Sequence, residues 1–235
     1  RNPEERLTIC RNLLEAVFHN ILSVLQYYQR RKGGLEKSIA AVKELEQKLA
    51  EQDTPEGLMG LEGNVRKLYY QSWPVWLGKT AEHFKRVYHP PENPLNALIS
   101  FLNSLLYTAC VSELYRTALY PGISYLHTPQ TRRFSLALDL VEPFKPLLVD
   151  RMIFRLLDSR AIGDRDFRKH SNGFLLTDDA RRRILQEWDQ ELRRTVHYAP
   201  LNRSVSYRQL LRLDCYKLIN FLLEGREYLP YRIGY

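Results

Sequence analysis

The first thirty residues carry apolar side chains at alternating spacings of three and four, which places these side chains on one face of an α-helix. Asn2 predicts the helix start because its side chain can cap, with Pro3 suited to the first turn and Glu5 placed as in a capping box. Gly33 and Gly34 predict the end of this helix. The positions on the apolar face are Leu7, Cys10, Leu14, Val17, Ile21, Val24 and Tyr28.

A second apolar face follows over residues 35–49, opposite a face of mixed charge. It predicts a helix that folds back on the first as an antiparallel hairpin over residues 1–52. A third helix is predicted through residues 58–73. Asn93 lies before a proline and can cap the next helix, which we expect to start near Leu95.

Residues 135–146 form a further apolar segment, which two prolines interrupt. Residues 171–194 predict a short extended piece and then an arginine-rich helix capped by Thr177 or Asp178. We find no alternation of apolar and polar positions that predicts a β-strand, and no internal repeat.

Near the C-terminus, Ser206 and Gln209 form a capping box for a last helix, which Gly225 closes. The pattern as a whole predicts an all-α, mainly α fold. We expect one helical domain over residues 1–235, in which the hairpin precedes a helical core and the C-terminal helix over residues 53–235.

Composition adds a chemical preference to this helical picture. The chain has 235 residues, of which 44% are hydrophobic and 26% charged, as is ordinary for a soluble globular protein. The excess of 35 Lys and Arg over 27 Asp and Glu gives a formal charge of +8. This balance favours an anionic partner such as nucleic acid, although many basic proteins bind none.

The cysteines and the longest apolar stretch set the expected compartment. Cys10, Cys110 and Cys215 lie far apart, which argues against a zinc ribbon or a disulfide framework and fits a reducing cytoplasm. The stretch over residues 94–111 contains four Asn and Ser residues, so we expect no membrane span and no signal peptide. Because the chain opens on Arg1 directly at a helix start, we expect it to be part of a longer protein.

Several enzyme classes lack their motifs. The sequence has no GxGxxG, GxxxxGK[ST], HExxH or GxSxG pattern, which argues against dinucleotide, P-loop, zincin and hydrolase-elbow sites. It also lacks the adjacent His-Asp pair of metal phosphohydrolases. Carboxylates at apolar positions remain as candidate functional groups.

Glu62 is the first such carboxylate, because it lies in the apolar stripe of the third predicted helix. A lone carboxylate is costly to bury, and Gly60 and Gly63 leave room beside it for a ligand or another backbone. The alternative is that Glu62 lies at the edge of the stripe and pairs with Arg66, one turn later. The other stripe positions are Leu58, Val65 and Tyr69.

Asp139 and Glu142 are three residues apart and project from the same helical face. Two like charges at this distance are unfavourable unless a cation or a proton lies between them. Pro143 and Pro146 cannot donate to the carbonyls four residues before them, so we expect the helix to kink or restart here. The alternative is a bent helix whose acids face water.

His127 follows a short apolar run on a predicted loop. A single histidine is more often a hydrogen-bonded residue than a metal ligand, and pattern alone does not separate these two interpretations. The other five histidines lack an acidic neighbourhood in sequence, and we expect no site at them.

Taken together, five segments resemble the successive motifs of the CRISPR-associated integrase family that acts in spacer acquisition. They occur in the order of that family and extend over nearly the whole chain. The segments are LEGNVRKLYY, NPLNALISFLNSLLY, YLHTP, SLALDLVEPFKPLLVD and VSYRQL with the late YLPY.

The resemblance implies a helical catalytic domain in which a Glu, a His and an acidic residue bind one divalent ion. By motif, the ligands are Glu62, His127 and Glu142, with Asp139 as a neighbouring catalytic acid that orients water or a second ion. Pro143 departs from the polar or acidic residue usual after the third ligand, which puts the local helix geometry in doubt. Two carboxylates and one imidazole form a mostly hard site with open positions, suited to Mn²⁺ or Mg²⁺.

The implied function is a metal-dependent DNA endonuclease and integrase that inserts spacers into a CRISPR array by transesterification. Such an ion can polarise a phosphodiester and stabilise the attacking or leaving hydroxyl. The expected partner is double-stranded DNA, both prespacer and CRISPR repeat, in a bacterial or archaeal cytoplasm. The basic residues near the ligands are candidates for holding phosphates without reading bases. They are Arg66, Lys67, Arg132, Arg133 and Lys145.

Members of this family carry an N-terminal β-rich domain, through which they form homodimers and contact a small CRISPR-associated partner protein. We expect that domain to be absent from these residues. A competing hypothesis is a non-catalytic helical scaffold that binds nucleic acid or protein through its basic faces. Separation of the three proposed ligands by more than one metal-coordination sphere would favour the scaffold.

Overall fold

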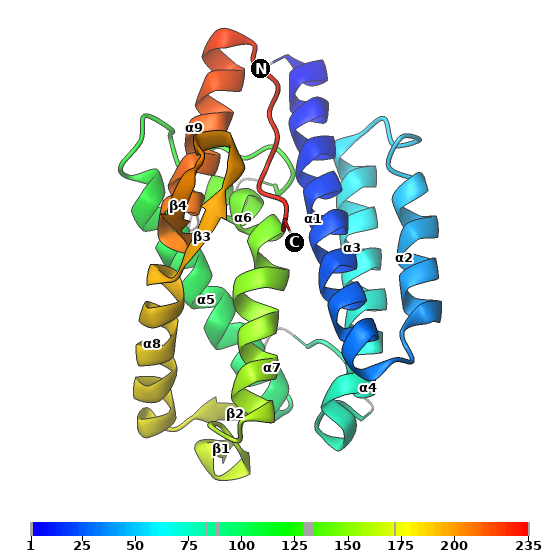
Figure 1. Cartoon of the computed structure of the whole chain (residues 1–235), viewed down its shortest axis with the longest axis vertical. Helices are drawn as coiled ribbons and strands as arrows, with labels where there is room; N and C mark the ends of the chain where they lie inside the picture. Colours follow the sequence, from blue (N-terminus) through cyan, green and yellow to red (C-terminus); the bar gives the residue numbers. More distant parts are fainter. Residues whose placement is uncertain (1, 83, 88–89, 129–133, 172, 235) are drawn as a thin grey trace.

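The computed structural model describes residues 2–82, 84–87, 90–128, 134–171 and 173–234, and this part of the chain is mainly helical, as predicted (Figure 1). The α-helices are α1 (Pro3–Lys32), α2 (Glu36–Gln47), α3 (Pro55–Ser72), α4 (Pro74–Leu77), α5 (Pro94–Leu114), α6 (Ser135–Val141), α7 (Arg151–Asp158), α8 (Asp178–Arg193) and α9 (Tyr207–Glu224). Shorter helical turns are η1 (Gly78–Ala81), η2 (Glu142–Phe144), η3 (Lys145–Asp150), η4 (Asp164–Asp166) and η5 (Ala199–Leu201).

Side-chain caps set the starts of the long helices, and most lie where the sequence predicts them. Asn93 accepts a hydrogen bond from the N–H of Asn96 at the start of α5, and Thr177 caps α8. The capping box at the start of α9 is present. Asn2 caps α1 through the N–H of Glu4, without the expected capping box.

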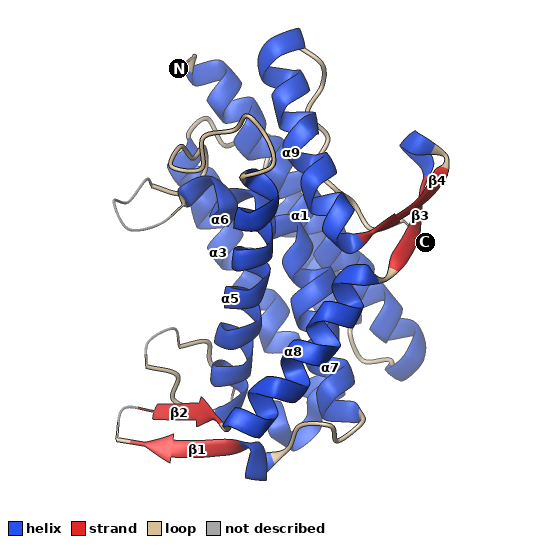
Figure 2. Cartoon of the chain, turned by 90° about the vertical axis from the view of Figure 1, so that its left-hand side faces the viewer, coloured by secondary structure: helices blue, strands red, loops and turns tan. Residues whose placement is uncertain are grey.

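Two short β-hairpins interrupt the helical pattern (Figure 2). β1 (Phe167–His170) pairs with β2 (Gly173–Leu176), and β3 (Thr195–Tyr198) pairs with β4 (Arg203–Ser206), both antiparallel. The extended piece expected before α8 is β2, whereas no pattern predicted the other three strands. Each strand has four residues, and three of the four in β1 are exposed, so no apolar alternation forms.

The helices pack around one hydrophobic core. α1 contacts α2, α3 and η2, and α5 contacts α6, α9 and η3. α5 is long and apolar enough to cross a membrane by length and composition alone, but half of its apolar window is buried inside the fold. These contacts are those of the core helix of a globular domain.

The C-terminal segment returns along α1 and joins it by hydrogen bonds (Figure 1). Asn20 of α1 is fully buried; it donates to the carbonyl of Tyr231 at 3.0 Å and accepts from the N–H of Ile233 at 2.7 Å. The same amide donates to the carbonyl of Pro143 at 2.7 Å. Asn20 therefore ties the C-terminal segment, α1 and η2 together next to Glu142.

Candidate active site

The proline segment changes helix type at the proposed ligand, as the sequence predicts. α6 ends at Val141, a 3₁₀ turn (η2) begins at Glu142, and the π-helical turn η3 follows before α7. The carbonyl of Asp139 accepts from the N–H of Glu142, and the carbonyl of Glu142 accepts from Lys145. Pro143 and Pro146 have no N–H to donate to these two carbonyls, and the 3₁₀ turn supplies the N–H donors in their place. The segment accommodates Pro143 through this 3₁₀ turn.

Asp139 is fully buried, and its carboxylate accepts four hydrogen bonds from the loop that carries His127. Oδ2 accepts from the N–H groups of Tyr125 at 2.6 Å and Leu126 at 3.2 Å. Oδ1 lies 3.0 Å from the N–H of His127 and 2.8 Å from its Nδ1. Each oxygen therefore accepts two hydrogen bonds from this loop, and the Nδ1 contact links Asp139 directly to the imidazole of His127.

This contact fixes the orientation of the imidazole. When Nδ1 donates to Asp139, Nε2 carries the free lone pair, the state in which histidine binds a metal. Nε2 of His127 lies 3.8 Å from Oε1 of Glu142. Two donor atoms at that separation can share an ion about 2.0–2.6 Å from each. The loop and η2 therefore bring two of the three proposed ligands together.

Arg66 joins Glu62, the remaining proposed ligand, to Glu142. Its Nε lies 3.2 Å from Oε1 of Glu62, and its Nη2 lies 3.1 Å from Oε2 of Glu142. Nη2 also donates to the carbonyl of Glu142 at 3.0 Å. The Glu62 side chain is 17% exposed and that of Arg66 only 7%, so the expected pair exists but is mostly buried.

The same guanidinium reaches a third carboxylate, which sequence reasoning missed. Nη1 of Arg66 lies 3.6 Å from Oδ2 of Asp150, which is buried in η3. Burial raises the pKa of Asp150 to about 7, against the lowering effect of Arg66. Arg66 is thus an internal counter-ion for three acids, a role that differs from the DNA contact expected from its position in sequence.

The other proposed DNA contacts differ in their accessibility. Lys67 is exposed on α3, and the partly exposed Lys145 bonds Oε1 of Glu142 through its ammonium group. Arg132 and Arg133 lie outside the described residues. Among the proposed DNA contacts that the structure describes, Lys67 is therefore the one with an exposed side chain.

The pKa values of the two carboxylates shift in opposite directions. Burial is the largest influence on Glu142 and raises its pKa, but Lys145, Arg66 and His127 together lower the pKa to about 2. Burial raises the pKa of Glu62, and the charge of Glu142 adds to this effect. Burial lowers the pKa of His127, but the hydrogen bond to Asp139 and the charge of Glu142 raise it overall.

The donor set has the chemistry of a divalent-ion site, although the side chains are not arranged around a common point. Among the described residues, no group of three or more His, Cys, Asp or Glu has the geometry to hold an ion. Two cationic groups, from Arg66 and Lys145, instead lie against the carboxylates. The fit to Mn²⁺ or Mg²⁺ therefore lies in the donor types, which are two carboxylates and one oriented imidazole.

Comparison with known proteins identifies relatives over almost the whole chain. The family model described as CRISPR associated protein Cas1 matches residues 1–190. The CRISPR-associated endonuclease Cas1 of Fusobacterium nucleatum is 42% identical over 232 residues, covering 99% of this chain and 69% of that protein. The corresponding protein of Clostridium perfringens is 43% identical over 232 residues, covering 97% of this chain and 69% of that protein.

Solved structures resemble the chain closely in fold. A CAS1 protein from Thermotoga maritima aligns with a TM-score of 0.84 at 36% identity, covering 94% of this chain and 67% of that one. A casposase bound to an integration product aligns with a TM-score of 0.83 at 21% identity, covering 99% of this chain and 70% of that one. At that identity, the second likeness extends to the fold alone.

Proposed function

Because the chain belongs to the Cas1 family of CRISPR-associated proteins, we propose that it is a metal-dependent DNA endonuclease and integrase. It inserts short DNA fragments as new spacers into a CRISPR array by phosphodiester transesterification. The relatives are named endonucleases, and these names support the proposal. The observation that carries it is the proximity of the three residues: Arg66 contacts both Glu62 and Glu142, and Nε2 of His127 lies 3.8 Å from Oε1 of Glu142.

In this proposal Glu62, His127 and Glu142 hold Mn²⁺ or Mg²⁺, which when bound polarises a phosphodiester and stabilises charge on its oxygens. Asp139 keeps the Nδ1 proton of His127, so that Nε2 is presented to the site. Arg66 keeps Glu142 ionised and holds both carboxylates in place. Lys145 can leave Glu142 for a phosphate oxygen, since its side chain is 23% exposed.

Double-stranded DNA, as prespacer and CRISPR repeat, is the proposed substrate, and it accounts for the formal charge of +8. Lys67 and Lys145 are the proposed phosphate contacts in the described part of the chain, and Arg132 and Arg133 remain candidates. Family membership supports a homodimer that binds a small CRISPR-associated partner protein, in the cytoplasm.

A cleavage and strand-transfer assay on labelled double-stranded DNA tests the proposal, with Mn²⁺ or Mg²⁺ and with EDTA. Glu142→Gln removes one proposed ligand charge at nearly constant volume and is expected to reduce activity by more than the roughly 10–100-fold typical of an outer-shell partner. DNA binding, measured by fluorescence anisotropy, is expected to persist.

Glu187→Gln is the matched control, because Glu187 is 44% exposed and lies outside the site. It is expected to keep full activity. Activity of Glu142→Gln equal to that of the unchanged protein, or activity that survives EDTA, would contradict the proposal and favour the non-catalytic scaffold.

A further inference from the structure

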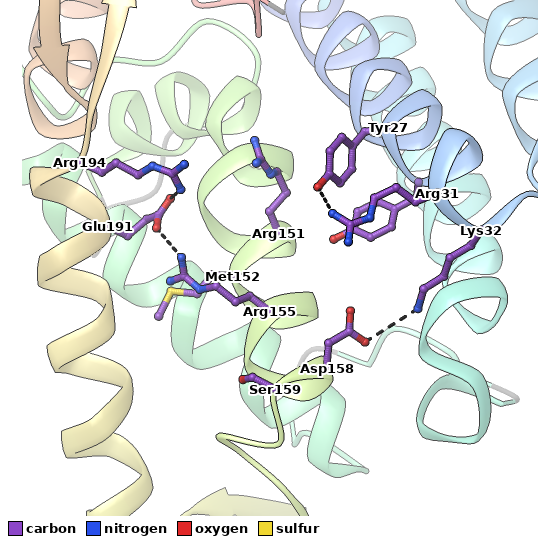
Figure 3. Close-up of a pocket in the computed structure, with 11 residues that line it drawn as sticks. Tyr27, Arg31, Lys32, Arg151, Met152, Arg155, Asp158, Ser159, Glu191 and Arg194 are labelled. Carbon is purple, nitrogen blue, oxygen red and sulfur yellow. Dashed lines mark hydrogen bonds and ion pairs between the residues drawn. The ribbon is translucent and has the colours of Figure 1, made fainter.

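A cavity of about 430 Å³ lies between the C-terminal end of α1, α7 and the C-terminal end of α8 (Figure 3). None of its lining residues belongs to the candidate active site. Its walls include Tyr27, Tyr28 and Met152, together with five basic and two acidic side chains. A cavity of this size is large enough for a small organic molecule such as a mononucleotide.

Three of the five basic groups already have carboxylate partners. Lys32 lies 3.9 Å from Asp158, and Arg155 lies 2.8 Å from Glu191. Arg194 lies 3.8 Å from the same Glu191. The charges of these side chains are therefore largely compensated within the protein.

Arg31 and Arg151 differ, because neither forms an ion pair with a carboxylate in the part of the chain that the structure describes. Their guanidinium carbons lie 5.4 Å and 5.7 Å from the centre of the Tyr27 ring. Arg31 also donates to the hydroxyl of Tyr27 at 2.5 Å, as the dashed line in Figure 3 shows. Tyr27 thus contacts two guanidinium groups that have no carboxylate ion-pair partner among the described residues.

We propose that this cavity binds a phosphate monoester, carried by the terminal nucleotide of a DNA strand. Two guanidinium groups without carboxylate partners match the charge of about −1.5 to −2 on a phosphate monoester at neutral pH. Their planar donors suit phosphate oxygens. An internal phosphodiester carries one charge and leaves one guanidinium uncompensated.

The phosphate part of the proposal stands on the cavity alone, whereas the choice of a DNA end as carrier rests on the proposed function. Arg151 directly follows Asp150, the buried acid that contacts Arg66. The cavity and the candidate active site are thus adjacent along η3 and α7. A strand end held in the cavity would leave the candidate active site open, because the two share no lining residue.

Isothermal titration calorimetry of the whole chain with thymidine 5′-monophosphate and with thymidine tests phosphate recognition. The nucleotide is expected to bind and thymidine is not. Arg31→Ala is expected to weaken nucleotide binding about tenfold or more, the scale of one charge-assisted hydrogen bond. Arg151→Met is expected to do the same while retaining its apolar stem.

Arg193→Ala is the matched control, because Arg193 is 77% exposed on α8 and outside the cavity. It is expected to bind the nucleotide unchanged. Because Arg31 is on the surface, its variant keeps the test valid if Arg151→Met fails to fold. Equal binding of nucleotide and thymidine, or equal binding by Arg31→Ala and the unchanged chain, would overturn the proposal.

Single-stranded oligonucleotides with and without a 5′-phosphate separate the two possible carriers. Tighter binding of the phosphorylated strand, lost in Arg31→Ala, supports a DNA end. Equal binding of both strands, together with nucleotide binding, overturns the DNA end and identifies a free nucleotide as the ligand. Loss of DNA cleavage in Glu142→Gln with unchanged nucleotide binding would show that the two sites act separately.

Discussion

Replacing Arg66 by Met tests whether a single guanidinium holds the candidate active site together. The Arg66 side chain is 7% exposed and lies 3.2 Å from Glu62, 3.1 Å from Glu142 and 3.6 Å from Asp150. Met retains much of the apolar stem but leaves these acids with Lys145 as their nearest cation. The substitution thereby removes the charge that stabilises the three acids, whereas the cost of burying those acids remains.

The expected loss in the free energy of unfolding is about 3–5 kcal/mol, as for removal of one partner from a buried ion pair. Simple addition over three pairs overestimates the loss, because an unpaired acid takes up a proton. Domains of this kind have total stabilities of roughly 5–15 kcal/mol, so the variant should remain measurable but much weakened. Urea unfolding followed by circular dichroism gives the value.

Arg155→Met is the matched control, since Arg155 also contacts two carboxylates, Glu187 at 3.4 Å and Glu191 at 2.8 Å. Its side chain is 43% exposed, so the expected loss is below about 1 kcal/mol. Arg66→Lys should recover part of the stability, because it restores one charge without the planar donor group. Similar small losses for Arg66→Met and Arg155→Met would refute the assignment of Arg66 as the internal counter-ion.

Two further predictions concern the acids around this network. Asp139→Asn removes the acceptor that orients His127, and DNA cleavage is expected to fall about 10–100-fold; full activity in the same assay would contradict the positioning role. The pKa of Asp150 is raised from 3.8 to about 7, so its stabilising contribution is fully present below 3.8 and is lost as pH rises to about 7. Asp150→Asn is therefore expected to gain stability relative to the unchanged chain as the pH rises from about 5 to about 8, as measured by urea unfolding. A stability difference that does not change with pH would show that Asp150 does not titrate in this range.

Sequence periodicity and capping chemistry determined the long helices. The apolar face and the glycines predicted α1, and Asn93, Thr177 and Ser206 predicted the starts of α5, α8 and α9. These features are local, because a cap and the N–H groups that it satisfies lie within one turn. The strands β1, β3 and β4 left no comparable pattern, and none of the residues of β1 and β3 is buried.

The candidate ligands were proposed from the sequence, because each lies in a segment that resembles a motif of the family. Their relation to one another was not. Arg66 and Glu142 are 76 residues apart in sequence, and only the packing of α3 against the proline segment brings the guanidinium onto the carboxylate. The contact between Arg66 and Asp150 likewise depends on the packing of segments that are distant in sequence.

Asp139 is the clearest example of a residue whose contacts could not be predicted from the sequence. Its spacing from Glu142 predicted two like charges that need a cation or a proton between them. In the structure the two acids have different partners, because Asp139 accepts four hydrogen bonds from residues 125–127, whereas Glu142 lies against Arg66 and Lys145. The sequence by itself determined which residues are acidic, helical and close to apolar faces. Only the tertiary structure decided which acid is held by backbone donors and which by cations, because that depends on contacts between segments distant in sequence.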